Sequence, residues 1–99
     1  MTKVLAKIIV SGVVQGVNYR WTVKRIADKH GIKGYVKNLA DRNVEVIAEE
    51  EKEKVEKFIE AIKVRNGFID VRNAKVEYKK PENKYKDFFI EKRDFKNYL

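Results

Sequence analysis

The chain has 99 residues, of which 43% are hydrophobic and 38% are charged, and its formal net charge is +8. This length predicts a single domain over residues 1–99, near the lower size limit for one hydrophobic core. The lack of cysteine excludes disulfide bonds and thiolate metal sites, and the lack of a long apolar stretch or a signal peptide predicts a cytoplasmic protein with no membrane partner.

The net charge has two interpretations, a surface for nucleic acid or an attraction for small anions. Lysines are scattered among glutamates along the chain, and no block of like charge alternates with aromatic residues that could stack on bases. We therefore expect a solvated surface with a mild attraction for anions, and nucleic acid is not the expected partner.

The first predicted element is a strand, because apolar residues alternate over 4–10. The segment 12–20, Gly-Val-Val-Gln-Gly-Val-Asn-Tyr-Arg, follows this strand. Apolar residues then recur at helical spacing over 19–30. We expect Asn18 to be the N-cap of this helix and Gly31 to end it.

Alternating apolar residues bounded by turn residues predict further strands at about 33–39, 44–48, 74–78 and 85–90. A turn at 40–43 makes the first two of these a hairpin. A second helix is expected after the hairpin. The acidic run Glu49–Glu51 should open it, because negative charge is favourable at a helix N-terminus, and Asn66 and Gly67 should end it. Residues 91–99 are charged and remain unassigned.

The resulting order, β-α-β-β-α-β with a short fifth strand, predicts an α+β fold of the ferredoxin-like type. In this fold an antiparallel sheet carries both helices on one face. That arrangement buries the apolar side of every predicted element.

The segment 12–20 is the main candidate site. A glycine-containing turn between a strand and a helix exposes backbone N–H groups, which bind anions together with the positive end of the helix dipole. Gly16 can take a positive φ, so the chain can wrap around a small ion. Arg20 can donate to two oxygens of one phosphoryl group. The same residues also fit a tight connection in which the glycines only turn the chain and Arg20 lies on the surface.

The whole segment resembles the acylphosphatase signature Gly-x-Val-Gln-Gly-Val-x-(Phe/Tyr)-Arg. The matching positions are Gly12, Val14, Gln15, Gly16, Val17, Tyr19 and Arg20. A second signature of that family matches at Gly34, Tyr35, Val36, Lys37, Asn38 and Val44. Arg42 and Glu50 stand where the family has glycine. The resemblance covers about residues 4–90.

The resemblance implies hydrolysis of an acyl phosphate, a carboxylic–phosphoric mixed anhydride, to a carboxylate and phosphate, with no metal ion or other cofactor. It implies two catalytic residues: Arg20 would bind the phosphoryl group, and Asn38 would orient the attacking water. The expected substrate-binding residues are Gln15, Gly16, Val17, Asn18, Tyr19 and Arg20. Inorganic phosphate, the product, is expected to compete with the substrate.

Other interpretations stay open. The chain could be a non-catalytic module of the same fold that binds anions or nucleic acid. It could also be a domain that serves a larger carbamoyl-transfer machine, which the length of 99 residues disfavours. Asn38 alone could simply hydrogen-bond the turn at the end of its strand. The glutamates at 49–53 could hold a hard cation, although an acidic helix start is more often a solvated surface.

Overall fold

The computed structural model describes residues 2–92, and its elements confirm the predicted α+β class. They are β1 (Lys3–Val13), α1 (Tyr19–His30), β2 (Lys33–Asn38), β3 (Val44–Glu51), α2 (Lys52–Ala61), β4 (Arg65–Asn66), β5 (Ile69–Lys79) and β6 (Phe88–Ile90). The strands form one sheet in the order β4-β5-β1-β3-β2-β6. Neighbouring strands are antiparallel, except that β6 runs parallel to β2.

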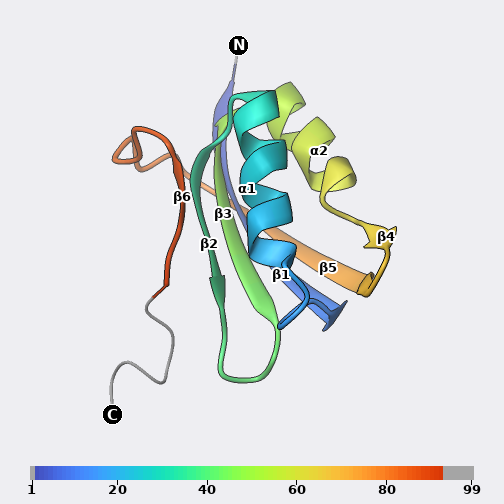
Figure 1. The fold of residues 1–99 in the computed structure, drawn as a ribbon. Helices are drawn as coiled ribbons and strands as arrows, with labels where there is room; N and C mark the ends of the chain where they lie inside the picture. The colour runs from blue at the N-terminus through green and yellow to red at the C-terminus, as the bar shows by residue number, and fades with distance from the viewer. Residues whose placement is uncertain (1, 93–99) are drawn as a thin grey trace.

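Both helices lie on one face of the sheet, as predicted (Figure 1). The hydrophobic core fills the layer between the helices and the sheet. Alternate residues of β1 and β3 are fully buried there: Ala6, Ile8, Val10, Val44, Val46 and Ala48. The helices bury Tyr19, Val23, Ala27, Val55, Phe58 and Ile59 against them. Burial of apolar area, at about 25 cal/mol per Å², therefore holds the start of α1 firmly on the sheet.

The prediction that Glu49–Glu51 opens the second helix holds only for Glu51, which is the N-cap of α2, and is wrong for Glu49 and Glu50. All three residues end β3, where they pair with residues 3–5 of β1, and α2 begins at Lys52. The Glu49 side chain is fully buried and accepts hydrogen bonds from the backbone N–H groups of Glu82 and Asn83. Strand pairing and these charge-assisted bonds outweigh the preference of exposed acidic residues for a helix start, which is worth only about 0.3–1 kcal/mol.

The prediction that Asn66 and Gly67 end the second helix is also wrong, because α2 ends at Ala61. Asn66 belongs to the short strand β4, whose pairing with β5 leaves Gly67 and Phe68 as a two-residue turn. The pairing of β4 with β5 thus gives backbone hydrogen bonds to residues that were expected to form the end of the helix.

The last predicted strand is shorter than residues 85–90. Only Phe88–Ile90 pairs with β2, while the ring of Tyr85 packs against that of Tyr35, with centroids 6.1 Å apart. Of the unassigned residues, 91 and 92 are outside any strand or helix, and 93–99 lie outside the described residues.

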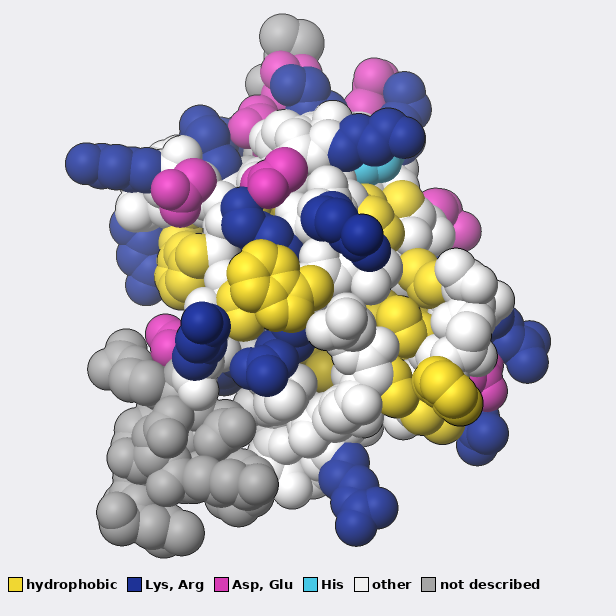
Figure 2. Space-filling model, viewed as in Figure 1, with side chains coloured by type: hydrophobic (Ala, Val, Ile, Leu, Met, Phe, Trp, Pro, Cys, Tyr) yellow, Lys and Arg dark blue, Asp and Glu magenta, His cyan; other side chains and the backbone are white. Residues whose placement is uncertain are grey.

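Basic side chains are spread over the face that carries the helices, with acidic side chains among them (Figure 2). On α1, for example, Lys24 Nζ lies 2.7 Å from a carboxylate oxygen of Asp28. Lys63 Nζ lies 2.7 Å from Glu60 in the same way. Within residues 2–92, neither helix has the length and apolar character needed to cross a membrane.

Candidate active site

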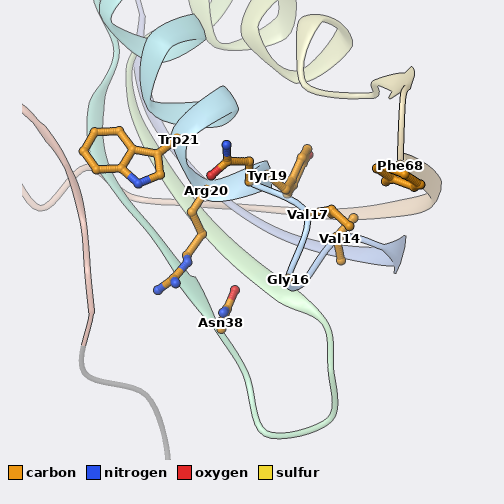
Figure 3. Close-up of a pocket in the computed structure, with 9 residues that line it drawn as sticks. Val14, Gly16, Val17, Tyr19, Arg20, Trp21, Asn38 and Phe68 are labelled. Atoms are coloured by element: carbon orange, nitrogen blue, oxygen red, sulfur yellow. The ribbon is translucent and has the colours of Figure 1, made fainter.

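The loop 14–18 joins β1 to α1 and bends sharply at two residues. Gly16 and Asn18 have φ angles of +75° and +69°. Glycine adopts such angles without steric cost, and asparagine does so more readily than most residues. Asn18 is the N-cap of α1, as predicted, but its side chain makes no capping hydrogen bond. The loop lines a cavity of about 440 Å³ beside the start of the helix (Figure 3).

The start of α1 offers free backbone donors to this cavity. Among the described residues, the first backbone N–H of the helix with a backbone acceptor is that of Thr22, which donates to Asn18 O at 3.1 Å. The preceding N–H groups, of residues 19–21, have no carbonyl within the helix to bind. All three of these residues line the cavity. The helix dipole adds a partial positive charge at the same place, so an anion is favoured there.

Tyr19 contributes its backbone to the cavity and its side chain to the core. The ring is fully buried, and its hydroxyl donates to the carbonyl oxygen of Ile62 at 2.6 Å. Burial raises the pKa of the Tyr19 phenol well above its ordinary value, so the side chain stays neutral. It anchors the first turn of α1 to the end of α2.

Arg20 extends from the first turn of α1 towards the part of β2 that carries Asn38 (Figure 3). Among residues 2–92, no carboxylate lies within ion-pair distance of its guanidinium. The five donors of this group are therefore available to an anion in the cavity.

Asn38 ends β2 and lines the same cavity from the opposite side to the loop. Its Oδ1 atom is buried and accepts no hydrogen bond from any described group. Such buried polar atoms are rare in proteins, and each one requires an explanation. An atom of this kind beside a cationic side chain can accept from a water molecule, and the amide nitrogen can donate.

Gln15 is the one predicted substrate-binding residue that does not line this cavity. Its Nε2 donates to the carbonyl oxygens of Leu39 and Asn43, at 2.8 Å each. These carbonyls belong to the turn that follows Asn38. Gln15 therefore joins the loop 14–18 to the end of β2, which fixes the two sides of the cavity relative to each other.

Gly12 lies in β1 and not in the anion-binding turn, where it was predicted. Its φ is +125°, and a Cβ built there would overlap the carbonyl oxygen of Asp70 in β5. The register of β1 and β5 shifts between Ser11 and Gly12. Only glycine allows this close approach, which brings the turn between β4 and β5 next to the cavity.

Two aromatic residues complete the cavity, and neither was predicted as a site residue. They are Trp21 in α1 and Phe68 in the turn between β4 and β5. Both side chains are exposed. The sequence does contain a signal for Trp21, because this large apolar residue lies outside the apolar pattern of the predicted helix. Phe68 carries no such signal, because its position depends on the approach of β5 to Gly12.

In the turn after Asn38, Arg42 stands where the resemblance expected glycine. Arg42 adopts a φ of +74°, which is uncommon for a residue with a Cβ. Hydrogen bonds hold the turn: Leu39 N–H donates to Asn43 O at 2.9 Å, Asn43 N–H donates to Asp41 Oδ1 at 3.1 Å, and Gln15 donates to both ends. Arg42 therefore holds a strained backbone conformation that these hydrogen bonds keep in place.

Comparison with known proteins gives a consistent result. The family model described as Acylphosphatase matches residues 6–90. A protein named Acylphosphatase from Archaeoglobus fulgidus is 42% identical over 84 residues, which cover 85% of this chain and 93% of that protein.

Solved structures agree. The crystal structure of acylphosphatase from Bacillus subtilis matches with a TM-score of 0.84 and 35% identity, over 89% of this chain and 98% of that one. Full-length HypF, in its phosphate- and nucleotide-bound form, matches with a TM-score of 0.83 and 29% identity. That match covers 95% of this chain but only 12% of HypF.

Proposed function

Because the chain belongs to the acylphosphatase family, we propose that Arg20 and Asn38 carry out acyl phosphate hydrolysis without a metal ion. The family and structure matches support acylphosphatase activity, which makes the protein a hydrolase. The observation that carries the proposed mechanism is the pairing of two side chains in one cavity: a guanidinium and a buried carboxamide oxygen that have, within residues 2–92, no carboxylate partner and no hydrogen-bond donor respectively.

The phosphoryl group of the substrate sits against the loop 14–18 and the start of α1. Backbone N–H groups of residues 16–20 and the guanidinium of Arg20 donate to its oxygens, and they offset negative charge as it moves onto them. The backbone of Gln15 belongs to the same loop, while its side chain holds the turn after Asn38. Catalysis therefore comes from positioning the substrate and from electrostatic stabilisation of the phosphoryl oxygens.

Asn38 holds the attacking water through its carboxamide, in line with the departing acyl oxygen. The water oxygen forms a bond to phosphorus as the bond between phosphorus and the acyl oxygen breaks, and the carboxylate leaves with the electron pair. Among the described residues that line the cavity there is no carboxylate or histidine to act as a general base. The proton of the water therefore goes to an oxygen of the substrate itself.

Inorganic phosphate is expected to inhibit hydrolysis competitively, because it presents the same tetrahedral oxygens to the loop and to Arg20. EDTA is expected to leave the rate unchanged. Within residues 2–92, no group of three or more His, Cys, Asp or Glu side chains is arranged to hold a metal ion. Both effects are measured in one assay of acetyl phosphate hydrolysis. Loss of activity in EDTA that a divalent cation restores would contradict the proposed mechanism.

The rival function, a non-catalytic module for anions or nucleic acid, is not favoured. Lysines that could bind a polyanion are partly neutralised: Lys7 and Lys37 both lie within 4.0 Å of carboxylate oxygens of Glu45, at 3.8 and 3.7 Å. We further propose that residues 1–99 form one domain that acts in the cytoplasm on a small substrate, without nucleic acid.

A further inference from the structure

A second cavity lies on the face of the sheet opposite the helices. The segment 80–87 joins β5 to β6, and it has to cross the sheet because β1, β3 and β2 lie between these two strands. It crosses opposite the helices, since its backbone binds Glu49, which alternates in β3 with residues that face the helices. The segment and the strands below it enclose about 260 Å³. None of the described residues that line this cavity also lines the candidate active site.

The crossing segment 80–87 is fixed in place by a carboxylate below it. Glu49 is fully buried and accepts hydrogen bonds from the backbone N–H groups of Glu82 and Asn83. Lys3 Nζ donates to Asn83 Oδ1 at 3.0 Å from the side. The wall that this segment gives to the cavity is therefore preorganised, which lowers the entropy cost of binding a ligand there.

The lining of the cavity carries an excess of positive charge. Four lysines and two glutamates contribute to it: Lys7, Lys79, Lys80, Lys84, Glu45 and Glu82. Both glutamates are already paired, Glu45 with Lys7 at 3.8 Å and Glu82 with Lys84 at 3.6 Å. Among residues 2–92, no carboxylate lies within ion-pair distance of Lys79 or Lys80. These two neighbouring ammonium groups are therefore available to an anion.

Two tyrosines give the same cavity an aromatic wall. Tyr35 of β2 and Tyr85 of the crossing segment both line it, and their ring centroids are 6.1 Å apart. The ring of Tyr35 is supported from the side by Phe89, at 5.9 Å between centroids. Its hydroxyl donates to Glu45 Oε2 at 2.7 Å, which holds a carboxylate acceptor beside the rings. Aromatic rings of this kind stack on planar bases, and a carboxylate accepts hydrogen bonds from the amino group of a base.

We propose that this cavity binds a nucleoside monophosphate, a planar base joined to a phosphate. The base enters the cavity and contacts the rings of Tyr35 and Tyr85, and the phosphate lies at the rim on Lys79 and Lys80. The volume of about 260 Å³ is just below the range of roughly 300–1,000 Å³ of pockets that enclose drug-sized ligands. A base therefore fits inside while the phosphate stays on the exposed lysines. The site is additional to the proposed hydrolysis, which uses none of these residues.

A single nucleotide fits this face better than a strand of nucleic acid. Glu77 of β5 pairs directly with Lys7 of β1, so an acidic side chain stands next to the lysine on the same face. On the other side, Glu45 lies 3.7 Å from Lys37. Acidic side chains thus interrupt the lysines across the sheet, whereas a nucleic acid strand requires a basic groove that follows several nucleotides.

The test is calorimetric titration of adenosine 5′-monophosphate into the Arg20→Ala protein, in which the candidate active site has lost its main phosphate contact. We expect one nucleotide to bind per chain, at least tenfold more tightly than ribose 5-phosphate, which lacks the base. Adenosine, which lacks the phosphate, should also bind more weakly. Equal affinities for the nucleotide and ribose 5-phosphate, or no binding, would overturn the proposal. Because the titration needs no turnover, its outcome is independent of the proposed function.

Variants of the cavity locate the nucleotide. Tyr85→Ala should lower the affinity about tenfold, and Tyr85→Phe, which keeps the ring, should retain it. Replacing both Lys79 and Lys80 with glutamine should lower the affinity for the nucleotide to that for adenosine, and the exposure of both side chains should leave the melting temperature unchanged. Unchanged nucleotide affinity in this double variant would contradict the site.

Lys75→Gln is the matched control, because Lys75 is an exposed lysine of β5 outside the cavity; it should leave nucleotide binding unchanged. A loss in Lys75→Gln as large as in the double variant would mean that binding follows net charge alone, and would overturn the proposal. So would tighter binding of a trinucleotide than of the monophosphate, since the face would then bind single-stranded nucleic acid.

Discussion

Arg20→Ala is expected to lower kcat/KM for an acyl phosphate by a factor of about 10² to 10³ or more, because a preorganised donor to the transition-state charge is lost. The protein should remain folded. Arg20 has no ion pair among the described residues, so its removal leaves no buried charge without a partner. Steady-state kinetics and thermal unfolding on the same preparation measure both effects.

Two further variants sharpen this result. Arg20→Lys keeps the positive charge but loses the planar pair of donors, so only part of the activity should return. Arg25→Ala removes an exposed arginine of the same helix, outside the cavity, and should retain normal activity. Near-normal turnover of Arg20→Ala at saturating substrate would remove Arg20 from the mechanism.

Asn38→Ala is expected to separate chemistry from binding. Its kcat should fall steeply, because the attacking water loses its partner, while its affinity for inorganic phosphate stays nearly unchanged, because Arg20 and the backbone donors remain. The melting temperature should not fall, since the Oδ1 atom accepts no hydrogen bond from the described part of the chain whose loss would destabilise the fold. Calorimetric titration with phosphate, turnover and thermal unfolding together measure these effects.

The opposite pattern would identify a structural role for Asn38. If the side chain only holds the end of β2, Asn38→Ala should melt at a lower temperature and keep its turnover per folded molecule. Asn73→Ala, on the exposed part of β5, provides a control for loss of a strand asparagine away from the cavity.

Local sequence was enough to predict most of the fold, because hydrophobic periodicity reflects the faces that each element buries. It failed where a long-range contact outweighed a local preference. Glu49 looks like part of an acidic helix start, but backbone N–H groups some thirty residues later bind its carboxylate inside the structure. Nothing in the local pattern of residues 49–51 indicates that the backbone of residues 82 and 83 binds this carboxylate.

The candidate site shows the same division. Arg20 and Asn38 were named from sequence motifs, and they line one cavity. The part played by the Gln15 side chain was not predictable, because its acceptors lie in a turn that only the folded sheet brings near. Phe68 was missed for a related reason: its place beside the cavity follows from the contact between Gly12 and Asp70, residues far apart in the sequence.

The central claim is that water held by Asn38 attacks phosphorus in a cavity that needs no metal ion. The most direct measurement is hydrolysis of benzoyl phosphate in water labelled with the heavy isotope of oxygen, in the presence of EDTA. Mass spectrometry of both products, corrected for the uncatalysed reaction, locates the label. We predict full activity with the label in inorganic phosphate. Label in the benzoate would mean attack at the acyl carbon and would contradict the proposed mechanism.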